Sequence, residues 1–585
     1  MPGEMNVDVL VVGAGLGGVA ASIAAAEQGV TVMLVEQSNW IGGQLTAQGV
    51  CTPDEDTLDG QAVVEMYGST ASYRDLKTRI RQWYRTNTTL SPTGQAQPSL
   101  NMGRCWVNTG FAVEPAVAIG VLEQMLSEAG VTPVLSAKVS GQALAGARLI
   151  SSVTVLESDG SSTTVTPKFV LDSTETGDLL PMFGLPYAIG AEARADTGEP
   201  DAPPDAHPEW IQPVTYPFAL SRGLVGQDFT IDKPANYDQL NQSLKFSLVD
   251  GDITAMFSGK APFWTYRRIV DHTIFSDPRY THDVATINVK ANDYIGGIYP
   301  DDSNSGNNAA VLDAARGVSL AYLYWLQTEA PRDDGSPESG WPEFLPLTTF
   351  FNTSDAISPA PYIRESRRII PITRITQQSL DADFNPGPRG NIFPDSCGIG
   401  NYGMDVHAGA NGGPELQKPT KPYQIPAGAL VPKACDNLIA SGKCLGATHI
   451  TNGAYRLHPQ EWNVGEAAGA LAAFCVHTGS TPAAVLASAD ALAQYQNVLL
   501  GRGVPLFWWS DVLGNPFWAH INMVGVRKAF SGDTDSLAFR PGDPFEEGDK
   551  APVQASIGKP LNWPPLPMTR AKAAQFVASQ MGWVQ

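Results

Sequence analysis

Residues 8–36 read DVLVVGAGLGGVAASIAAAEQGVTVMLVE, in which an apolar run is followed by glycines, small residues and a second apolar run. Val9 to Val12 predict a buried parallel strand, Ala20 to Gln28 a helix, and Val30 to Val35 a second strand. Strand, helix and strand in this order predict an α/β fold built on a parallel sheet.

Three glycines in this stretch, Gly13, Gly15 and Gly18, follow the G-x-G-x-x-G spacing. The first allows a tight turn, the second lets the backbone approach a ligand, and the third lets the helix pack closely on the sheet. A phosphate would then lie at the positive end of the helix dipole. Glu36 ends the second strand roughly 20 residues later, where a carboxylate binds ribose hydroxyls and disfavours a 2′-phosphate. These features predict a dinucleotide site that does not take NADP.

The net charge of the chain limits which classes of partner it is expected to bind. The chain has 585 residues, enough for two or three domains. Its 38 Lys and Arg residues against 59 Asp and Glu residues give a net charge of −21, which disfavours nucleic acid and anionic membranes. A small-molecule partner is compatible with this charge, and homo-oligomer formation stays open.

Cysteine usage argues against a metal centre. The six cysteines form no C-x-x-C pair and no cluster with histidine, so we expect neither a metal or iron-sulfur site nor a disulfide framework. The first strand begins within about eight residues, which leaves no room for a secretion signal. The apolar runs are too short to cross a bilayer. We therefore expect a cytoplasmic protein.

Further elements follow from the spacing of apolar residues. After the opening stretch we expect two helices, a strand, a hairpin that leads back into the sheet, and a late return to the nucleotide domain. The expected ranges are 73–84 and 114–129 for the helices, 131–135 for the strand, 148–157 and 163–166 for the hairpin, 169–172 and 437–442 for sheet strands, and 465–477 and 485–500 for later helices.

Seven more motifs carry a family resemblance. They are GGQLTAQ (42–48), LDSTETGDL (171–179), YRR (266–268), INVKANDY (287–294), YIRESRR (362–368), NLIASGKCLGATH (437–449) and RLHPQEWNVGEAAG (456–469). With the opening stretch they resemble the glutathione-reductase-like superfamily of FAD-dependent oxidoreductases, and within it a bacterial group whose substrates are mostly unassigned.

This resemblance implies a Rossmann-like FAD-binding domain of the glutathione-reductase type, interrupted by an inserted α+β substrate domain. The first part of the FAD-binding domain is then residues 1–178 and the substrate domain is 179–425. The FAD-binding domain resumes at 426–480, and a C-terminal helical and irregular cap covers 481–585.

The resemblance also implies which residues bind FAD. The pyrophosphate and adenosine would contact the opening loop and Glu36, the ribityl chain and isoalloxazine would follow the GGQLT segment, and a late helix would open toward the flavin C2 carbonyl. The implied residues are Gly13, Gly15, Leu16, Gly17, Gly18, Glu36, Gln37, Gly42, Gly43, Gln44, Leu45, Thr46, Val139, Thr174, Gly177, Asp178, Gly465, Glu466, Ala467 and Ala468. Relatives that bind FAD covalently use a histidine where this chain has Gly43, so we expect non-covalent FAD.

Four residues are candidates for catalysis. His458 lies seven positions before Gly465 and is our first candidate for acid/base work, with Glu461 orienting it or binding a cationic substrate. Packing or helix capping is the alternative role for both. Arg364 is a candidate anchor for a substrate carboxylate or carbonyl, against the alternative of a solvated ion pair. His407 is a weaker acid/base candidate.

The function that we expect is removal of a hydride from a CH–OH or CH–NH carbon of a small organic substrate onto flavin N5. Flavin chemistry at C=C bonds, as reductase or desaturase, is the alternative. Hydroxylation or halogenation ranks lower, because the chain has neither W-x-W-x-I-P nor a second G-x-G-x-x-G. The tail segments FRPGDP (539–544) and MTRAKAAQF (568–576) faintly resemble a surface-layer homology unit, so a cell-surface interaction protein is a minor alternative. The electron acceptor, whether oxygen, a quinone or a carrier protein, stays open.

Overall fold

A six-stranded sheet lies beneath the opening glycine turn in the computed structural model, which describes residues 3–58, 61–106, 110–146, 148–530 and 535–584. The strand order is β2-β1-β5-β4-β3, and β18 pairs with β5 in addition. The bounds are β1 (Gly3–Val12), β2 (Val32–Val35), β3 (Lys138–Ala145), β4 (Leu149–Leu156), β5 (Ser162–Asp172) and β18 (Leu438–Ala440). The parallel sheet that the opening stretch predicts is confirmed by the pairing of β1 with β2 and β5.

Strand β5 belongs to two pairing patterns at once. Its first residues pair antiparallel with β4, as the expected hairpin requires. Its later residues pair in parallel with β1 and β18. The second hairpin strand, expected at 163–166, and the strand expected at 169–172 are therefore one continuous strand, β5.

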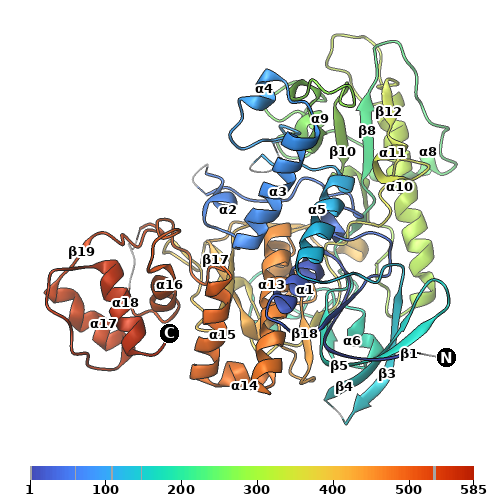
Figure 1. Ribbon diagram of the computed structural model, residues 1–585. Helices are drawn as coiled ribbons and strands as arrows, with labels where there is room; N and C mark the ends of the chain where they lie inside the picture. Colours follow the sequence, from blue (N-terminus) through green and yellow to red (C-terminus); the bar gives the residue numbers. More distant parts are fainter. Residues whose placement is uncertain (1–2, 59–60, 107–109, 147, 531–534, 585) are drawn as a thin grey trace.

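Helices α1 (Leu16–Ala26) and α13 (His458–Thr478) cross at backbone contact (Figure 1). A Cβ atom on Gly465 would overlap the carbonyl oxygen of Gly17, and one on Gly469 would overlap that of Ala21. Glycine is required here because no side chain fits between the two backbones. This packing brings the start of α13 against the glycine turn.

Three elements differ from those that the sequence predicts. The helix expected to open at Gly465 begins seven residues earlier, because Pro459 is accommodated in its first turn. The strand expected at 131–135 is a single bridge between Val134 and Val35. The helix expected at 485–500 is divided by Ser488, whose side chain caps the second part.

A second, smaller sheet carries its own hydrophobic core. Its order is β12 (Phe344–Pro346), β8 (Phe218–Arg222), β10 (Val284–Ile287) and β9 (Arg268–Val270). Helix α10 (Asn308–Thr328) packs beside it, and the core residues come from positions 214–363. The core of the first sheet draws instead on both ends of the chain. The domain boundaries at 178, 425 and 480 remain a prediction.

The remaining elements cover these cores or connect them. The other helices are α2 (Val63–Met66), α3 (Ala71–Asn87), α4 (Pro92–Gln95), α5 (Pro115–Glu128), α6 (Leu179–Met182), α7 (Arg194–Thr197), α8 (Tyr237–Leu244), α9 (Phe263–Tyr266), α11 (Thr348–Phe351), α12 (His449–Tyr455), α14 (Pro482–Ala487), α15 (Ala489–Gly501), α16 (Trp518–Val526), α17 (Lys550–Ile557) and α18 (Arg570–Gln580). Short strand pairs are β6 (Tyr187–Ala188) with β13 (Arg368–Ile369), β7 (Val214–Thr215) with β11 (Asp293–Tyr294), β14 (Ser396–Gly400) with β17 (Tyr423–Pro426), β15 (Met404–Val406) with β16 (Leu416–Lys418), and β19 (Pro544–Phe545) with β20 (Met568–Thr569).

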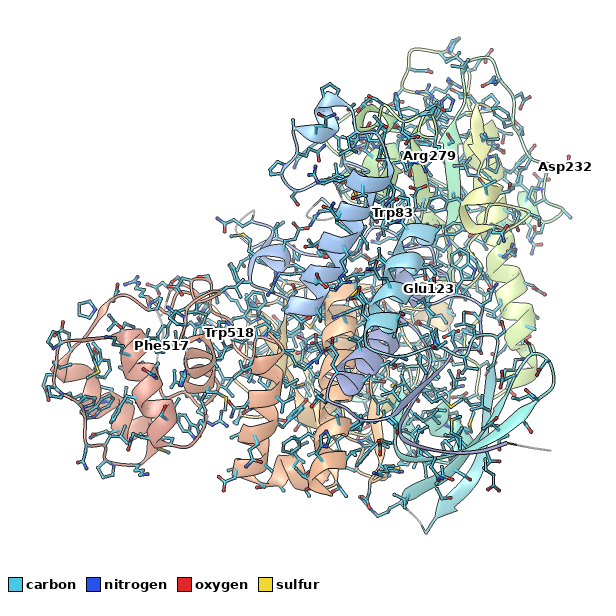
Figure 2. All side chains as sticks on the ribbon, viewed as in Figure 1. Trp83, Glu123, Asp232, Arg279, Phe517 and Trp518 are labelled. Carbon is cyan, nitrogen blue, oxygen red and sulfur yellow. The ribbon has the colours of Figure 1, made fainter. Side chains whose placement is uncertain are left out.

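Helices α16, α17 and α18 form a lobe at one side of the molecule, and Trp518 lies where it joins the main body (Figure 2). The two tail segments singled out in the sequence meet in this lobe. Strand β19 pairs with β20, and the amide of Arg570 donates to the carbonyl of Asp543 at 2.9 Å. The interaction-protein alternative remains a prediction. Within the described residues, no helix combines the length and apolar character needed to cross a membrane.

The crossing of α1 and α13 gives a test of the packing. We expect Gly469→Ala to lower the free energy of unfolding by about 1–3 kcal/mol, since the added methyl group must push the helices apart. Gly120→Ala is the control, because a Cβ atom at this helical position meets nothing within 4 Å and favours the helix. Urea unfolding of both variants measures the difference. Equal stability of the two would contradict the close contact.

Candidate functional site

The glycine turn between β1 and α1 is shaped by close backbone approach. Gly13 has a φ of 97°, and a Cβ atom there would overlap the backbone of Ser173. A Cβ atom on Gly18 would overlap the Gly13 carbonyl oxygen. Leu16 and Gly17 complete the first turn of α1. The residues that the sequence assigned to the pyrophosphate therefore form one turn.

A cavity of about 240 Å³ adjoins this turn. Burial raises the pKa of Glu36, while hydrogen bonds from the amides of Ala14 (2.7 Å) and Ser38 (2.8 Å) oppose that effect. The cavity brings together seven of the residues predicted to bind FAD, from four separate segments: Gly13, Gly15, Glu36, Gln37, Val139, Thr174 and Asp178.

The GGQLT segment lies at the other end of the turn. Gly42 precedes a short 3₁₀ turn, Gly43–Leu45, and Thr46 ends it. The side chain of Gln44 is buried, and its Nε2 donates to the carbonyl of Arg456 at 3.1 Å. Among the described residues its Oε1 has no hydrogen-bond partner.

The side chain of Glu461, a residue of α13, lies at the start of α1. One of its carboxylate oxygens accepts from the amide of Gly17 at 3.3 Å and the other from Gln44. Burial raises its pKa to about 7; Lys443 opposes this effect and Glu175 adds to it. A Cβ atom on Gly15 would lie 2.9 Å from Glu175 and 3.0 Å from Glu461. Two carboxylates thus lie where a helix N-terminus attracts an anion.

These observations fit FAD. The helix N-terminus already takes an anionic group, the acid-bearing cavity beside it suits a nucleoside, and Gln44 has a buried acceptor without a partner. Glu461, which we expected to orient His458, lies on the nucleotide side of that residue.

The four residues expected to open a helix toward the flavin lie inside α13 instead. Gly465 packs on α1, and Ala467 and Ala468 are fully buried. Glu466 binds Ser72 and, at 3.1 Å, Arg502. Gly177 lies against the backbone of Arg367. The N-terminus of α13 is at His458, so that residue and its neighbours hold the position that the sequence assigned to Gly465.

His458 is fully buried and both of its ring nitrogens contact backbone. Its Nδ1 accepts from the amide of Asp54 at 3.2 Å, and its Nε2 lies 3.0 Å from the carbonyl of Val50. Burial lowers its pKa to about 4. A neutral ring that joins both backbone groups favours a role in holding residues 50–54.

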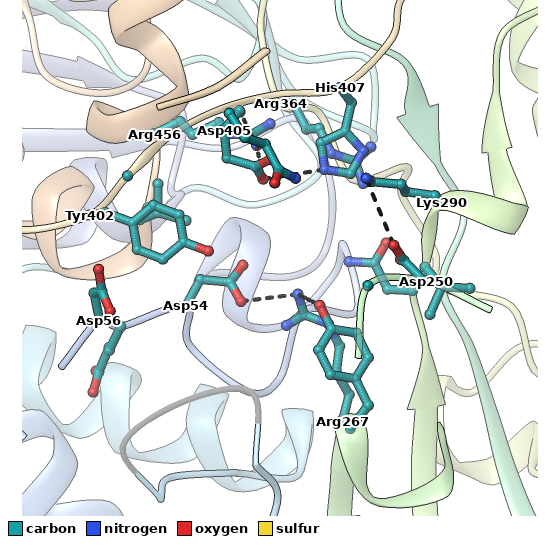
Figure 3. Close-up of a pocket in the computed structure, with 18 of the residues that line it drawn as sticks. Asp54, Asp56, Asp250, Arg267, Lys290, Arg364, Tyr402, Asp405, His407 and Arg456 are labelled. Carbon is teal, nitrogen blue, oxygen red and sulfur yellow. Dashed lines mark hydrogen bonds and ion pairs between the residues drawn. The ribbon is translucent and has the colours of Figure 1, made fainter. Parts of the chain in front are cut away.

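A larger cavity, of about 650 Å³, opens next to this segment (Figure 3). Its wall is polar and charged, with aromatic rings between the charges. The charged and aromatic residues that line it are Asp54, Glu55, Asp56, Trp106, Asp250, Asp252, Tyr266, Arg267, Lys290, Tyr362, Arg364, Tyr402, Asp405, His407, Lys418 and Arg456.

His407 lies between two carboxylates on this wall. Its Nδ1 is 2.6 Å from Asp293 and its Nε2 is 3.3 Å from Asp405. Asp293 also binds Arg364 at 3.0 Å. Burial raises the pKa of Asp293, but Arg364 and His407 bring it below its usual value.

Asp405 contacts both His407 and Arg456. It binds Nη2 of Arg456 through both its side chain (3.3 Å) and its backbone carbonyl (2.9 Å). Burial raises the pKa of Asp405, but the hydrogen bond and charge of His407, with Arg456 and Arg364, bring it well below its usual range. Both carboxylates that face His407 are therefore ionised at neutral pH.

A second ion pair lies across the cavity. Arg267 binds Asp54 at 2.9 Å and the hydroxyl of Thr52 at 3.0 Å, and its guanidinium lies over the ring of Tyr266. Burial lowers the pKa of Arg267, but the charge of Asp54 raises it above the usual value.

The structure thus brings Arg364 and His407 together and separates them from His458 and Glu461. Sequence reasoning missed Arg267, Asp405 and Arg456 as site residues. Arg267 and Arg456 lie inside the motifs YRR and RLHPQEW, which was the available signal. Asp405 lies in none of the quoted motifs.

The family described as FAD dependent oxidoreductase matches residues 8–499. No curated protein matches the chain. Among solved structures, a flavoprotein/dehydrogenase from Cytophaga hutchinsonii is 15% identical, covering 40% of this chain and 48% of that one, with a TM-score of 0.21.

Two further structures match parts of the chain. L-proline dehydrogenase from P. horikoshii is 16% identical, covering 30% of this chain and 23% of that one, with a TM-score of 0.17. The aromatic hydroxylase CabE of angucycline biosynthesis is 14% identical, covering 63% and 54%, with a TM-score of 0.27. The chain spans between 23% and 54% of the length of these three proteins.

The environment of Glu461 predicts a pH-dependent stability of the FAD-free protein. Because its folded-state pKa of about 7 lies above the ordinary 4.5, its contribution to folding is present below pH 4.5 and is lost as the pH rises through 7. Glutamine does not titrate, so the Glu461→Gln variant does not lose this stability. Its free energy of unfolding, relative to that of wild type, should rise by about 3 kcal/mol between pH 4.5 and pH 7.

Chemical denaturation at several pH values measures this difference. Glu123→Gln, at an exposed position on α5 (Figure 2), is the control and should track wild type. A constant offset between Glu461→Gln and wild type at every pH would show that the carboxylate is not held in this environment.

Proposed function

The chain belongs to the FAD dependent oxidoreductase family, and on that premise we propose that it oxidises a CH–OH or CH–NH carbon of a small polar molecule held in the 650 Å³ cavity. When bound, FAD supplies the acceptor for the hydride that leaves the substrate carbon. The remaining requirements fall to the protein: an oriented substrate and a group that takes the one proton released by the hydroxyl or amine.

FAD binding in this proposal is non-covalent and follows the glutathione-reductase-like arrangement. The residues that would hold it are the glycine turn, Glu36 and the GGQLT segment. Support comes from the cavity beside Glu36 and from the buried, unpartnered Oε1 of Gln44. His407 and His449 both have protein partners, since His407 binds Asp293 and His449 binds Glu365.

The observation that carries the proposed reaction is His407 between Asp293 and Asp405. In this proposal the ring holds one proton on Nδ1, toward Asp293 at 2.6 Å, and in the neutral ring Nε2 accepts the proton of the substrate hydroxyl or amine. The hydrogen bond from Nε2 to Asp405 belongs to the protonated ring that results. Asp405, 3.3 Å from Nε2, stabilises the imidazolium that results. The substrate carbon thereby loses one hydride and its heteroatom one proton, which gives a carbonyl or an imine.

Arginines add to the effect of His407 in lowering the pKa of both carboxylates. Arg364 binds Asp293, and Arg456 binds Asp405. The rings of Tyr266, Tyr362 and Tyr402 supply apolar surface between the charges and limit water in the cavity. In this proposal His458 is a positioning residue that holds residues 50–54 at the cavity edge.

Reduction or desaturation of a C=C bond is the alternative, since the same imidazole can give or take a proton at carbon. Product identity separates the two reactions. A ketone, aldehyde or imine supports our proposal, and a product that differs only in a C=C bond supports the alternative.

The direct test is anaerobic mixing of the purified yellow protein with a panel of alcohols, hydroxy acids and amines. We expect the flavin absorbance to bleach with at least one compound and one equivalent of carbonyl or imine product to form. Bleaching that yields only an alkene or alkane product would refute the proposed reaction.

Replacement of His407 tests the proton acceptor. We expect His407→Asn to slow flavin reduction by about 10²–10⁴-fold while FAD content stays the same. His272→Asn is the matched control, because His272 also binds an aspartate, Asp283 at 2.7 Å, but lies outside the cavity. Stopped-flow absorbance measures both. A His407→Asn protein as fast as wild type would remove this residue from the mechanism.

A further inference from the structure

We propose that Arg456 anchors a carboxylate of the substrate, which makes the substrate a hydroxy acid or an amino acid. The inference rests on the proposed function and adds the substrate class to it. Arg456 was not among the candidates from the sequence, where Arg364 was expected to have this role.

The hydrogen bonds of the three cavity arginines single out Arg456. Arg364 uses both terminal nitrogens, Nη1 on Thr215 (2.7 Å) and Nη2 on Asp293 (3.0 Å). Arg267 likewise uses Nη1 and Nη2, on Thr52 and Asp54. The Nε of each has no hydrogen-bond partner among the described residues, but both terminal nitrogens of these two guanidinium groups bind the protein.

Arg456 uses only one nitrogen. Its Nη2 donates to Asp405, while Nη1 and Nε have no hydrogen-bond partner among the described residues. The residue is only 2% exposed, and it lines the cavity. Buried donors without partners are costly, and an acceptor brought by a ligand removes that cost.

Charge favours an ionised acceptor. Asp293 and Asp405 face Arg364, Arg456 and His407, so two negative charges serve two guanidinium groups and one imidazole. When the imidazole takes a proton, this cluster carries one excess positive charge. Of the other carboxylates that line the cavity, Asp54 faces Arg267 and Asp250 faces Lys290 at 3.7 Å, while burial raises the pKa of Asp56 and so favours its neutral form. A substrate carboxylate supplies the missing negative charge, and its hydrogen bonds to a guanidinium are stronger than those of a neutral group.

The position of Arg456 suits an anchor. It lies between α12 and α13 and lines the cavity (Figure 3), and its carbonyl accepts from Gln44 of the predicted flavin segment. Through Asp405 it is also joined to His407. An acid bound by Arg456 therefore lies between the residues proposed for FAD and the proposed proton acceptor.

The test compares acids with their amides on the holoprotein. Glycolate, lactate, malate and alanine are titrated beside glycolamide, lactamide, malamide and alaninamide, with flavin absorbance and tryptophan fluorescence as binding readouts. We expect at least one acid to bind about tenfold or more tightly than its amide. This comparison needs no variant and does not depend on turnover.

Variants then test whether Arg456 causes the preference for an acid over its amide. Arg456→Lys should reduce the preference for the acid, since lysine keeps the charge but loses the planar donors. Arg316→Lys is the matched control, because Arg316 binds Asp355 at 2.6 Å and does not line the cavity. Equal binding of every acid and amide, no binding of any acid at millimolar concentration, or an unchanged preference in Arg456→Lys would each overturn the proposal.

The outcomes separate the anchor from the proposed reaction. An acid that binds through Arg456 without bleaching the flavin supports the anchor and counts against the reaction. A neutral alcohol that is oxidised equally fast by wild type and Arg456→Lys supports the reaction and counts against the anchor.

Discussion

Backbone contact between α1 and α13 is the constraint on which the rest of the site depends. Gly465 and Gly469 allow the two helices to touch, at Gly17 and Ala21. Because α13 is held there, its first turn lies against the glycine turn of the nucleotide site, and Glu461 reaches the amide of Gly17. Arg456, two residues before α13, is placed by the same contact on the wall of the larger cavity. One packing interaction thus positions both sides of the proposed reaction.

The charged side chains at the larger cavity form ion pairs with one another and are not isolated charges. His407 is useful as a proton acceptor because Asp293 and Asp405 flank it and stabilise its charged form. Burial alone would raise the pKa of both carboxylates. Arg364 and His407 lower that of Asp293, and His407, with Arg456 and Arg364, lowers that of Asp405. The same cluster that holds the proton acceptor also holds the proposed substrate anchor.

Local chemistry explains what the sequence could predict. The glycine turn, β1, α1 and Glu36 follow from one continuous stretch, in which each residue type answers to a local backbone requirement. The start of α13 was predicted seven residues too late, because a run of small residues was taken for a helix start when it marks contact with α1. Asp293, His407 and Arg456 come from three segments far apart in sequence. Only the folded chain shows that His407 and Arg456 line one cavity and that Asp293 binds His407, so the sequence favours His458, which is nearer to the predicted FAD helix.

The central claim is that the large cavity and the FAD site meet at Gln44 and Arg456. A crystal structure of the purified protein with its FAD bound tests this most directly. The account predicts an isoalloxazine ring beside the Gly43–Leu45 turn, with one edge open to the cavity that His407 and Arg456 line. A ring placed elsewhere, or separated from that cavity by protein, would contradict it.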